Sequence, residues 1–166
     1  MRPSAEVMAD TATTRCELAG DILRSCGVLR FAATGCSMLP SVWSGDTLVV
    51  ERVDADQIQI GDVALIGRGG RLCAHRVVRL PGDAGDRYWI TQGDAMPRAD
   101  LPVFEQELLG RVSKVIRSGK CVPCSNLNRT NLLLAFIIRR SVFAERLFVY
   151  WASRRKSQKV DSLCQA

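Results

Sequence analysis

The chain has 166 residues, of which 47% are hydrophobic and 24% are charged, the balance of an ordinary soluble globular protein. This length suits one domain with a real core and is too short for two comfortable ones. The net charge of +6 is uneven, because residues 1–110 hold 11 Lys and Arg against 15 Asp and Glu, whereas residues 111–166 hold 12 against 2. The basic character therefore belongs to the last third of the chain.

The seven cysteines are scattered without the regular spacing of a disulfide-stapled domain. Their odd number and their spacing favour a reducing compartment. The one close pair, Cys121 and Cys124, has no second pair and no histidine beside it, so it lacks the four ligands of a zinc site. We expect neither a metal nor a cofactor, and the redox role of this pair stays open.

The first 20 residues contain no run of about 7–15 apolar residues after a basic start, so they predict neither a signal peptide nor a membrane span. We expect residues 1–13 to be a disordered lead-in. An amphipathic helix is predicted over residues 14–25, with Gly27 as its natural stop. Its apolar positions follow helical spacing at Cys16, Leu18, Ala19, Ile22, Leu23 and Cys26.

Short apolar-rich runs separated by Gly and Asp turns follow this helix. They cover residues 28–33, 47–53, 62–67, 71–80, 87–91 and 107–117. Six short strands at this spacing predict a mostly-β core, either a barrel or a pair of packed sheets. The sequence Gly67-Arg68-Gly69-Gly70 predicts a hairpin turn, and residues 81–86 predict another.

A basic helical extension is predicted over residues 121–166, with the helix itself at about 131–153. Its three central arginines would cost roughly 8–10 kcal/mol in a bilayer, whereas its Leu, Ile, Phe and Val residues return only about 3–7 kcal/mol. It should therefore not insert alone. A helix packed on the β core, a helix lying on an anionic membrane surface and an interaction helix stay open. We expect a cytoplasmic or peripherally membrane-associated protein, and no nucleic-acid partner, because no recognisable binding module is present.

The most informative stretch is Gly35-Cys36-Ser37-Met38-Leu39-Pro40. It is typical of a serine held on a rigid bend, although such a stretch taken alone more often marks a plain turn entering a strand. A serine nucleophile needs a base, and the chain has one histidine, His75, inside a predicted strand. The third group must be an acid that orients the imidazole, and Asp94 and Asp100 are the candidates, of which Asp94 is readily explained as a turn residue.

Six modest motifs stand in a fixed order along the predicted β core. They are Gly-x-Ser-Met-x-Pro at 35–40, Ser44-Gly45-Asp46, Gly61-Asp62-Val63, His75-Arg76-Val77-Val78, Gly93-Asp94 with Asp100 six residues later, and Leu109-Gly110-Arg111-Val112. In order and spacing they resemble the signal peptidases of the endoplasmic-reticulum and archaeal type, over about residues 28–117. The resemblance implies a signal-peptidase/LexA-like β core of short strands, to which the sequence pattern adds an N-terminal amphipathic helix and a C-terminal helix.

The resemblance also assigns roles to individual residues. Ser37 matches the acylating nucleophile, His75 the general base that replaces the lysine of the bacterial branch, Asp100 the orienting acid and Asp94 a second, supporting acid. It implies a signal-peptidase-like serine endopeptidase that cleaves a precursor or leader peptide, bound as an extended strand. Shallow substrate pockets are expected near Met38, Leu39 and Val77.

The chain departs from the family at three points. Gly35 stands where family members usually carry a serine, whose hydroxyl is a second oxyanion donor in the bacterial branch, so the backbone N–H of Ser37 is the expected donor. Cys36 replaces a usual glycine. No N-terminal membrane anchor is evident, unlike in members that process exported proteins.

Two other interpretations remain. A self-cleaving repressor of the LexA type shares the β core, but it uses a lysine base and needs an N-terminal DNA-binding module, for which the predicted helix and its lead-in are too short. A catalytically inactive peptide-binding or adaptor module would keep the groove alone. If the pKa of His75 is near its unperturbed value of about 6.5, the activity of an enzyme should rise between about pH 6 and 7.5.

Overall fold

The computed structural model describes residues 5–82 and 87–122, with side chains from Thr14 onward. Within these residues the protein is mostly β, as predicted, with a single α-helix and two short 3₁₀ turns. The helix is α1 (Ala5–Cys26) and the 3₁₀ turns are η1 (Ala55–Gln57) and η2 (Glu105–Glu107). The strands are β1 (Val28–Ala32), β2 (Thr47–Glu51), β3 (Val63–Arg68), β4 (Arg71–Arg79), β5 (Tyr88–Gln92), β6 (Val103–Phe104), β7 (Leu108–Arg117) and β8 (Lys120–Val122).

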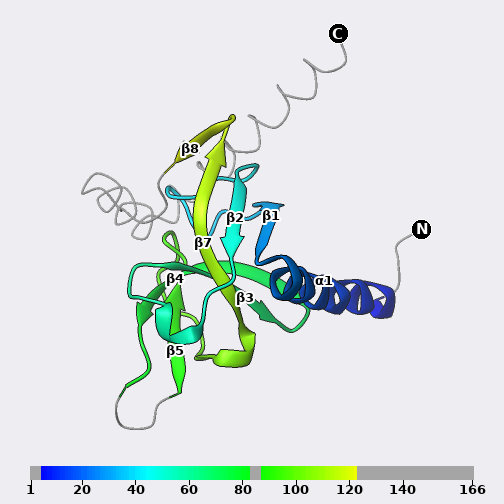
Figure 1. Ribbon diagram of the computed structural model, residues 1–166, viewed down its shortest axis with the longest axis horizontal. Coiled ribbons are helices and arrows are strands. Elements are labelled where there is room, and N and C mark those ends of the chain that lie inside the picture. The colour runs from blue at the N-terminus through cyan, green and yellow to red at the C-terminus, as the bar shows by residue number, and fades with distance from the viewer. Residues whose placement is uncertain (1–4, 83–86, 123–166) are drawn as a thin grey trace.

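All strand pairs are antiparallel, and the eight strands form one sheet in the order β1-β2-β7-β3-β4-β5-β6, with β8 paired to β7. The long strand β7 joins the two halves of this sheet (Figure 1). Its first residues pair with β3, and its later residues pair with β2. Strand β7 carries two bulges, because Ser113 is an extra residue opposite Val49 and Val50 of β2, and Leu109 is an extra residue opposite Leu65 and Ile66 of β3. Each extra residue bends the ladder.

The core consists of two hydrophobic clusters on opposite faces of β3. Side chains of β3 alternate between the faces, so Val63 and Leu65 belong to the first cluster and Ala64 and Ile66 to the second. All four are buried, which explains why this strand reads as a continuous apolar run. The other buried members of the first cluster are Leu23, Met38, Val42, Leu48, Val50, Val112 and Val115, and those of the second are Ile58, Val77, Trp89 and Val103.

Helix α1 begins at Ala5, which is earlier than the sequence pattern predicted. Residues 5–13 are helical, so the expectation of a disordered lead-in over residues 1–13 is wrong for this part. The reason is composition: Ala5, Ala9 and Ala12 favour a helix without any apolar face that a pattern search could detect. The helix ends at Gly27, whose φ of 72° and whose N–H bond to the Leu23 carbonyl form a left-handed cap.

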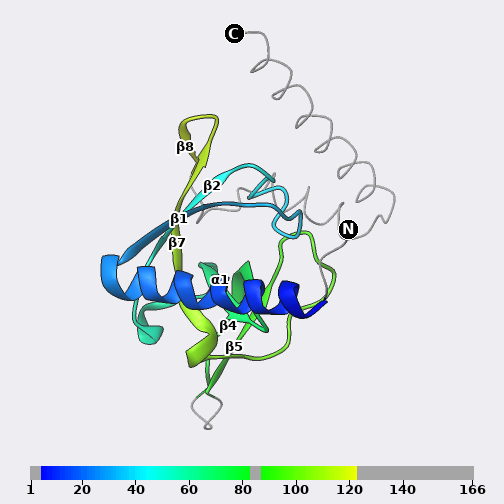
Figure 2. The same cartoon turned by 90° about the vertical axis from the view of Figure 1, so that its right-hand side faces the viewer.

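The apolar side of α1 packs on the sheet. Figure 2 shows the helix lying across the strands, and its contacts are with β1, β4 and β7. Leu23 is 1% exposed and joins the first cluster. Within the described residues, no helix is both long and apolar enough to cross a membrane.

The six predicted strands are confirmed to within a few residues, whereas β6 and β8 were not predicted because two or three residues carry too little pattern. The β3–β4 hairpin turns at Gly69 and Gly70, whose φ values of 54° and 74° fit a tight turn that glycine adopts without strain. The β4–β5 pairing was predicted as well, and the tip of that hairpin lies outside the described residues. The helix predicted at 131–153 and Cys124 also lie outside them.

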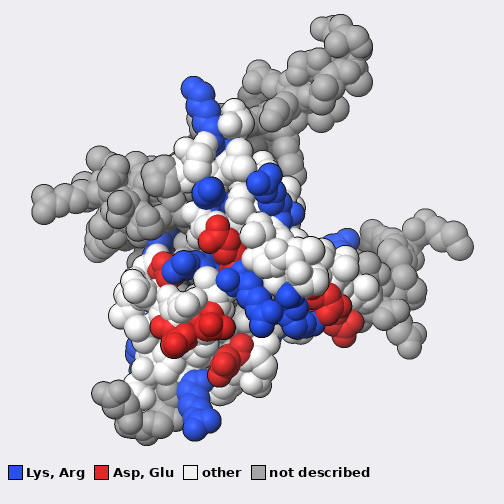
Figure 3. All heavy atoms as spheres, viewed as in Figure 1, with Lys and Arg blue, Asp and Glu red and all other residues white. Residues whose placement is uncertain are grey.

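Charged side chains of both signs lie interspersed on the face of the molecule shown in Figure 3. Neither sign forms a separate field on that face. Charge therefore marks particular sites in this fold rather than a whole surface.

Candidate active site

The stretch that carries Ser37 is a loop between β1 and β2 that is anchored by its apolar residues. Met38 and Val42 are buried in the first cluster, and the N–H of Val42 donates to the carbonyl of Met38 at 2.9 Å. The N–H of Leu39 donates to the carbonyl of Cys36 at 3.2 Å, which closes a turn around Ser37. Because the residues that follow it point into the core, Ser37 remains partly exposed on the bend.

His75 comes from the middle of β4 and is 7% exposed. Its Nε2 lies 2.9 Å from the Oγ of Ser37, which is 38 residues earlier in the chain. Its Nδ1 lies 2.6 Å from Oδ2 of Asp100. The structure therefore brings together three of the four residues that the sequence proposed as catalytic, in the order serine, histidine, carboxylate.

Asp100 is held in place by β5. Its N–H donates to the carbonyl of Thr91 at 2.8 Å, and the hydroxyl of Thr91 donates to its Oδ2 at 2.7 Å. Thr91 is fully buried. Sequence reasoning missed Thr91. Its position was a signal, because side chains alternate along β5 and Thr91 therefore faces inward together with Trp89.

The pKa values of this pair are shifted in opposite directions. Burial alone lowers the pKa of His75, but the hydrogen bond to Asp100 and the neighbouring Cys73 outweigh burial and raise the pKa from 6.5 to about 9. Burial raises the pKa of Asp100, but the hydrogen bonds from His75 and Thr91 and the positive charge of Arg68 bring it below its ordinary value. The expected activity rise between about pH 6 and 7.5 assumed an unshifted histidine, and the raised pKa moves it upward.

Asp94 does not touch His75. Its two carboxylate oxygens accept from Nε and Nη2 of Arg76 at 2.8 and 2.7 Å, and Oδ2 also accepts from the hydroxyl of Ser41 at 2.5 Å. Arg76 and Asp94 are 7% and 2% exposed, and Arg76 also donates to the carbonyl of Gly61 at 2.6 Å. Asp94 therefore acts as a buried clamp: through Ser41, four residues after Ser37, and through Arg76 it fixes the serine loop to β4.

A second clamp holds the far end of the same loop. The carboxylate of Asp46 is buried and accepts from the backbone N–H of Trp43 and from the guanidinium of Arg117 at 2.7 Å. Arg117 also donates to the carbonyl of Ser41 and lies over the ring of Trp43. Sequence reasoning included Asp46 and Arg76 in motifs but did not predict their ion pairs, and it missed Arg117 altogether, because a surface-type residue gives no signal that it reaches a distant loop.

Gly93 lets the loop after β5 approach Ser37. The N–H of Ala95 donates to the carbonyl of Ser37 at 2.9 Å. A Cβ at Gly93 would lie 2.6 Å from that same carbonyl oxygen, closer than real side chains approach backbone atoms. The sequence suggested a turn at this Gly-Asp pair, and the reason for glycine here is close contact with the candidate nucleophile.

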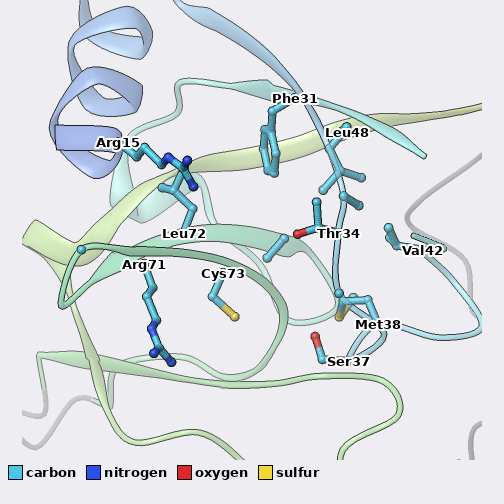
Figure 4. A pocket seen from close by; sticks show the side chains of 15 residues that line it. Arg15, Phe31, Thr34, Ser37, Met38, Val42, Leu48, Arg71, Leu72 and Cys73 are labelled. Carbon is cyan, nitrogen blue, oxygen red and sulfur yellow. The ribbon is translucent and has the colours of Figure 1, made fainter. Parts of the chain in front are cut away.

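A cavity of about 480 Å³ opens beside Ser37 (Figure 4). It lies between residues 31–35 and residues 70–74, so two stretches of β structure form its walls. Met38 is among the residues that line it. Leu39 and Val77 are not: Leu39 is 3% exposed, and Val77 is fully buried in the second cluster, so the expectation that they form substrate pockets is corrected.

Among the described residues, the backbone N–H of Ser37 is the candidate donor to an oxyanion. The N–H of Ser37 makes no hydrogen bond to the described part of the chain, which leaves it available. Gly35 offers no hydroxyl, and a Cβ there would meet nothing within 4 Å, so the missing side chain leaves open space. Across residues 5–82 and 87–122, no group of three or more His, Cys, Asp or Glu side chains is arranged to hold a metal ion.

No protein-family model matches the sequence, and no curated protein matches it significantly. The resemblance to signal peptidases thus rests on the motifs themselves. What the arrangement can do chemically follows from its geometry: an alcohol, a histidine and a carboxylate in hydrogen-bond contact can pass a proton from the alcohol to the imidazole and stabilise the resulting cation.

Proposed function

We propose that this protein is a serine endopeptidase of the signal-peptidase type, which cleaves a precursor or leader peptide by acyl transfer. The observation that supports this most is the hydrogen-bonded series from Ser37 Oγ through His75 to Asp100, with distances of 2.9 and 2.6 Å. Groups that are far apart in the sequence meet in the order that nucleophilic catalysis needs. The open cavity beside Ser37 supplies room for a substrate.

In the proposed mechanism His75 is neutral and its Nδ1–H donates to Asp100, which leaves Nε2 to accept the proton of Ser37. Oγ attacks the peptide carbonyl carbon, and the oxyanion accepts from the Ser37 N–H. His75 then gives its proton to the leaving amine nitrogen, and an ester to Ser37 remains. Water then loses a proton to Nε2 and attacks the ester carbon. The bond to Oγ breaks to release the peptide acid, and Nε2 returns the proton to Oγ of Ser37.

The substrate is proposed to bind as an extended strand. Within the described residues, positions 71–75 of β4 pair only with β3, so this part of the chain leaves the backbone groups on one edge of β4 unpaired beside the cavity. The opposite wall, residues 31–35, consists of the end of β1, the outermost strand of the sheet, and the residues that come directly after it. A peptide between the two walls would gain main-chain hydrogen bonds from β4, and its side chains would enter the cavity alternately.

The test compares wild type, Ser37→Ala and His75→Ala on a broad library of candidate precursor peptides, with cleavage read by mass spectrometry. We expect cleavage by the wild type and loss of several orders of magnitude in rate in both variants. Ser44→Ala is the matched control, because its hydroxyl lies in the same loop and makes only one long bond of 3.4 Å, to the Thr34 carbonyl. Equal cleavage by all four proteins, or none by the wild type, would contradict the proposal.

A further inference from the structure

Two arginines line the cavity at the end away from Ser37 and Met38 (Figure 4). Arg15 comes from α1 and Arg71 from the first position of β4. Both side chains are exposed, and neither guanidinium makes a hydrogen bond or an ion pair to the described part of the chain. Other arginines near the site are engaged: Arg68 with Glu107, Arg76 with Asp94 and Arg117 with Asp46.

The charge of this cavity differs from that of the chain around it. Residues 1–110 contain more acidic than basic residues, 15 against 11. Among the described residues that line the cavity, Arg15 and Arg71 are the charged ones, and no carboxylate accompanies them. The cavity wall therefore carries two positive charges that no carboxylate among the described lining residues neutralises.

The two arginines lie on opposite sides of the open edge of β4. Side chains alternate along a strand, so Arg71, Cys73 and His75 share one face, and Leu72 and Ala74 share the other. In Figure 4 the side chains of Arg71 and Cys73 leave β4 on one side, whereas Leu72 leaves it on the other, toward Arg15. A strand placed in the cavity would thus offer successive residues to the two arginines in turn.

The spacing along β4 fixes which residues of a bound peptide would meet them. Arg71 lies four residues from His75, or about 13 Å at roughly 3.3 Å per residue. A peptide paired with β4 advances at the same rate, so its residue four positions from the scissile residue would face Arg71. The residue next to it along the peptide, whose side chain points to the other face of the bound strand, would face Arg15.

We propose that the cavity selects peptides with an acidic side chain four residues from the scissile residue, recognised by Arg71, and at an adjacent position, recognised by Arg15. This inference rests on the proposed function, since it places the scissile residue at Ser37. It names the substrate class as an extended peptide with acidic residues at one end of a small, apolar stretch. The apolar wall between the arginines and Ser37 is formed mainly by Phe31, Leu48 and Leu72.

The test uses fluorescein-labelled decapeptides built from Ala and Val, in which one Asp, Asn or Lys is moved along the sequence. Binding is measured by fluorescence anisotropy on Ser37→Ala, and cleavage on the protein with Ser37 intact. Peptides with Asp should bind about fivefold more tightly than peptides with Asn when the residue stands at either of two adjacent positions. Added salt should reduce this ratio of affinities. Arg71→Gln should remove the preference at one position and Arg15→Gln at the other, and Arg71→Glu should favour Lys.

The matched control is Arg30→Gln, which removes the same charge from an exposed position of β1 that does not line the cavity. Equal binding of Asp and Asn peptides at every position, an equal loss of preference in Arg30→Gln, or no binding of any peptide would overturn the inference. Charge-selective binding without cleavage would instead contradict the proposed function alone. Cleavage that depends on Ser37 but not on peptide charge would contradict this inference alone.

Discussion

The only histidine of the chain lies between an alcohol and a carboxylate, and its environment determines what both can do. Asp100 keeps Nδ1 protonated, and its hydrogen bond, together with the neighbouring Cys73, outweighs burial and raises the pKa of the ring to about 9, so the imidazolium that forms during catalysis is stabilised. The same interaction keeps His75 charged near neutral pH in the free protein. A general base must be neutral, so strong stabilisation of the cation moves the active form to higher pH.

Replacing Asp100 should therefore change the titration of His75 in a defined direction. In the wild type we expect the single imidazole resonance to titrate near pH 9, and the kcat/KM for peptide cleavage to rise with pH through the same range. In Asp100→Asn the midpoint should fall toward about 6.5, and the maximal rate should drop on the order of 10⁴-fold, because the amide favours the wrong tautomer. NMR titration checks the pKa without any substrate.

Asp94→Asn is the control for this titration, because Asp94 binds Arg76 and Ser41 and not His75. Its midpoint should stay where the wild-type midpoint is, even if the serine loop is less stable. A wild-type midpoint near 6.5, or equal shifts in the two variants, would show that Asp100 does not govern the histidine.

The residues of the site could be predicted from the sequence to the extent that chemistry limits the choice. One histidine and a serine on a rigid bend leave few partners, and Asp100 was the acid that a turn explained less well. The clamps through Arg76, Arg117 and Thr91 could not be predicted, because their partners depend on which strands pair. Val77 was wrongly expected to line a substrate pocket. Strand alternation puts its side chain on the same face as that of His75, but it does not show at which residue of β4 the core begins to cover that face.

At the scale of elements, β4 and β7 organise the molecule. One half of β4 carries His75 and offers the free edge, and its other half pairs with β5, which positions Asp100. β7 pairs with β3 by its first residues and with β2 by its later ones. The sequence predicted both strands from their apolar runs, but not that β7 would join the two halves of the sheet, since alternation does not specify a partner.

At Gly110 strand β7 passes close to the end of β2, and Gly110→Ala tests that junction. A Cβ there would lie 2.5 Å from the carbonyl oxygen of Glu51 and 3.0 Å from Val50 Cγ1, so the two strands would have to separate. We expect a loss of about 1–3 kcal/mol in the free energy of unfolding, measured by urea denaturation. Gly67→Ala is the matched control, because a methyl group there meets first the movable side chain of Leu109, at 3.1 Å. Equal losses of stability in the two variants would show that the close contact between β2 and β7 does not require glycine at position 110.

At the scale of the whole molecule, the candidate site lies where the two core clusters meet. The loop that carries Ser37 is anchored through Met38 and Val42 in the first cluster. Asp100 is fixed by Thr91, whose strand places Trp89 in the second cluster. The geometry between Ser37 and Asp100 is therefore correct only when both clusters are formed. β3, buried on both faces, contributes to each of them.

Because they share β3 and β7, the two clusters should unfold as one unit. We expect urea unfolding to show one transition with the same midpoint by tryptophan fluorescence and by far-ultraviolet circular dichroism. In a protein whose Trp43 and Trp151 are replaced by Phe, so that Trp89 of the second cluster carries the fluorescence, Leu65→Ala removes a fully buried side chain of the first cluster. It should cost about 2–5 kcal/mol and shift both signals together. Ile60→Ala is the control, since Ile60 is 64% exposed and its loss should cost little. Separate midpoints for the two signals in Leu65→Ala would mean that the clusters are independent, and the site would then lose its geometry before the protein loses its fold.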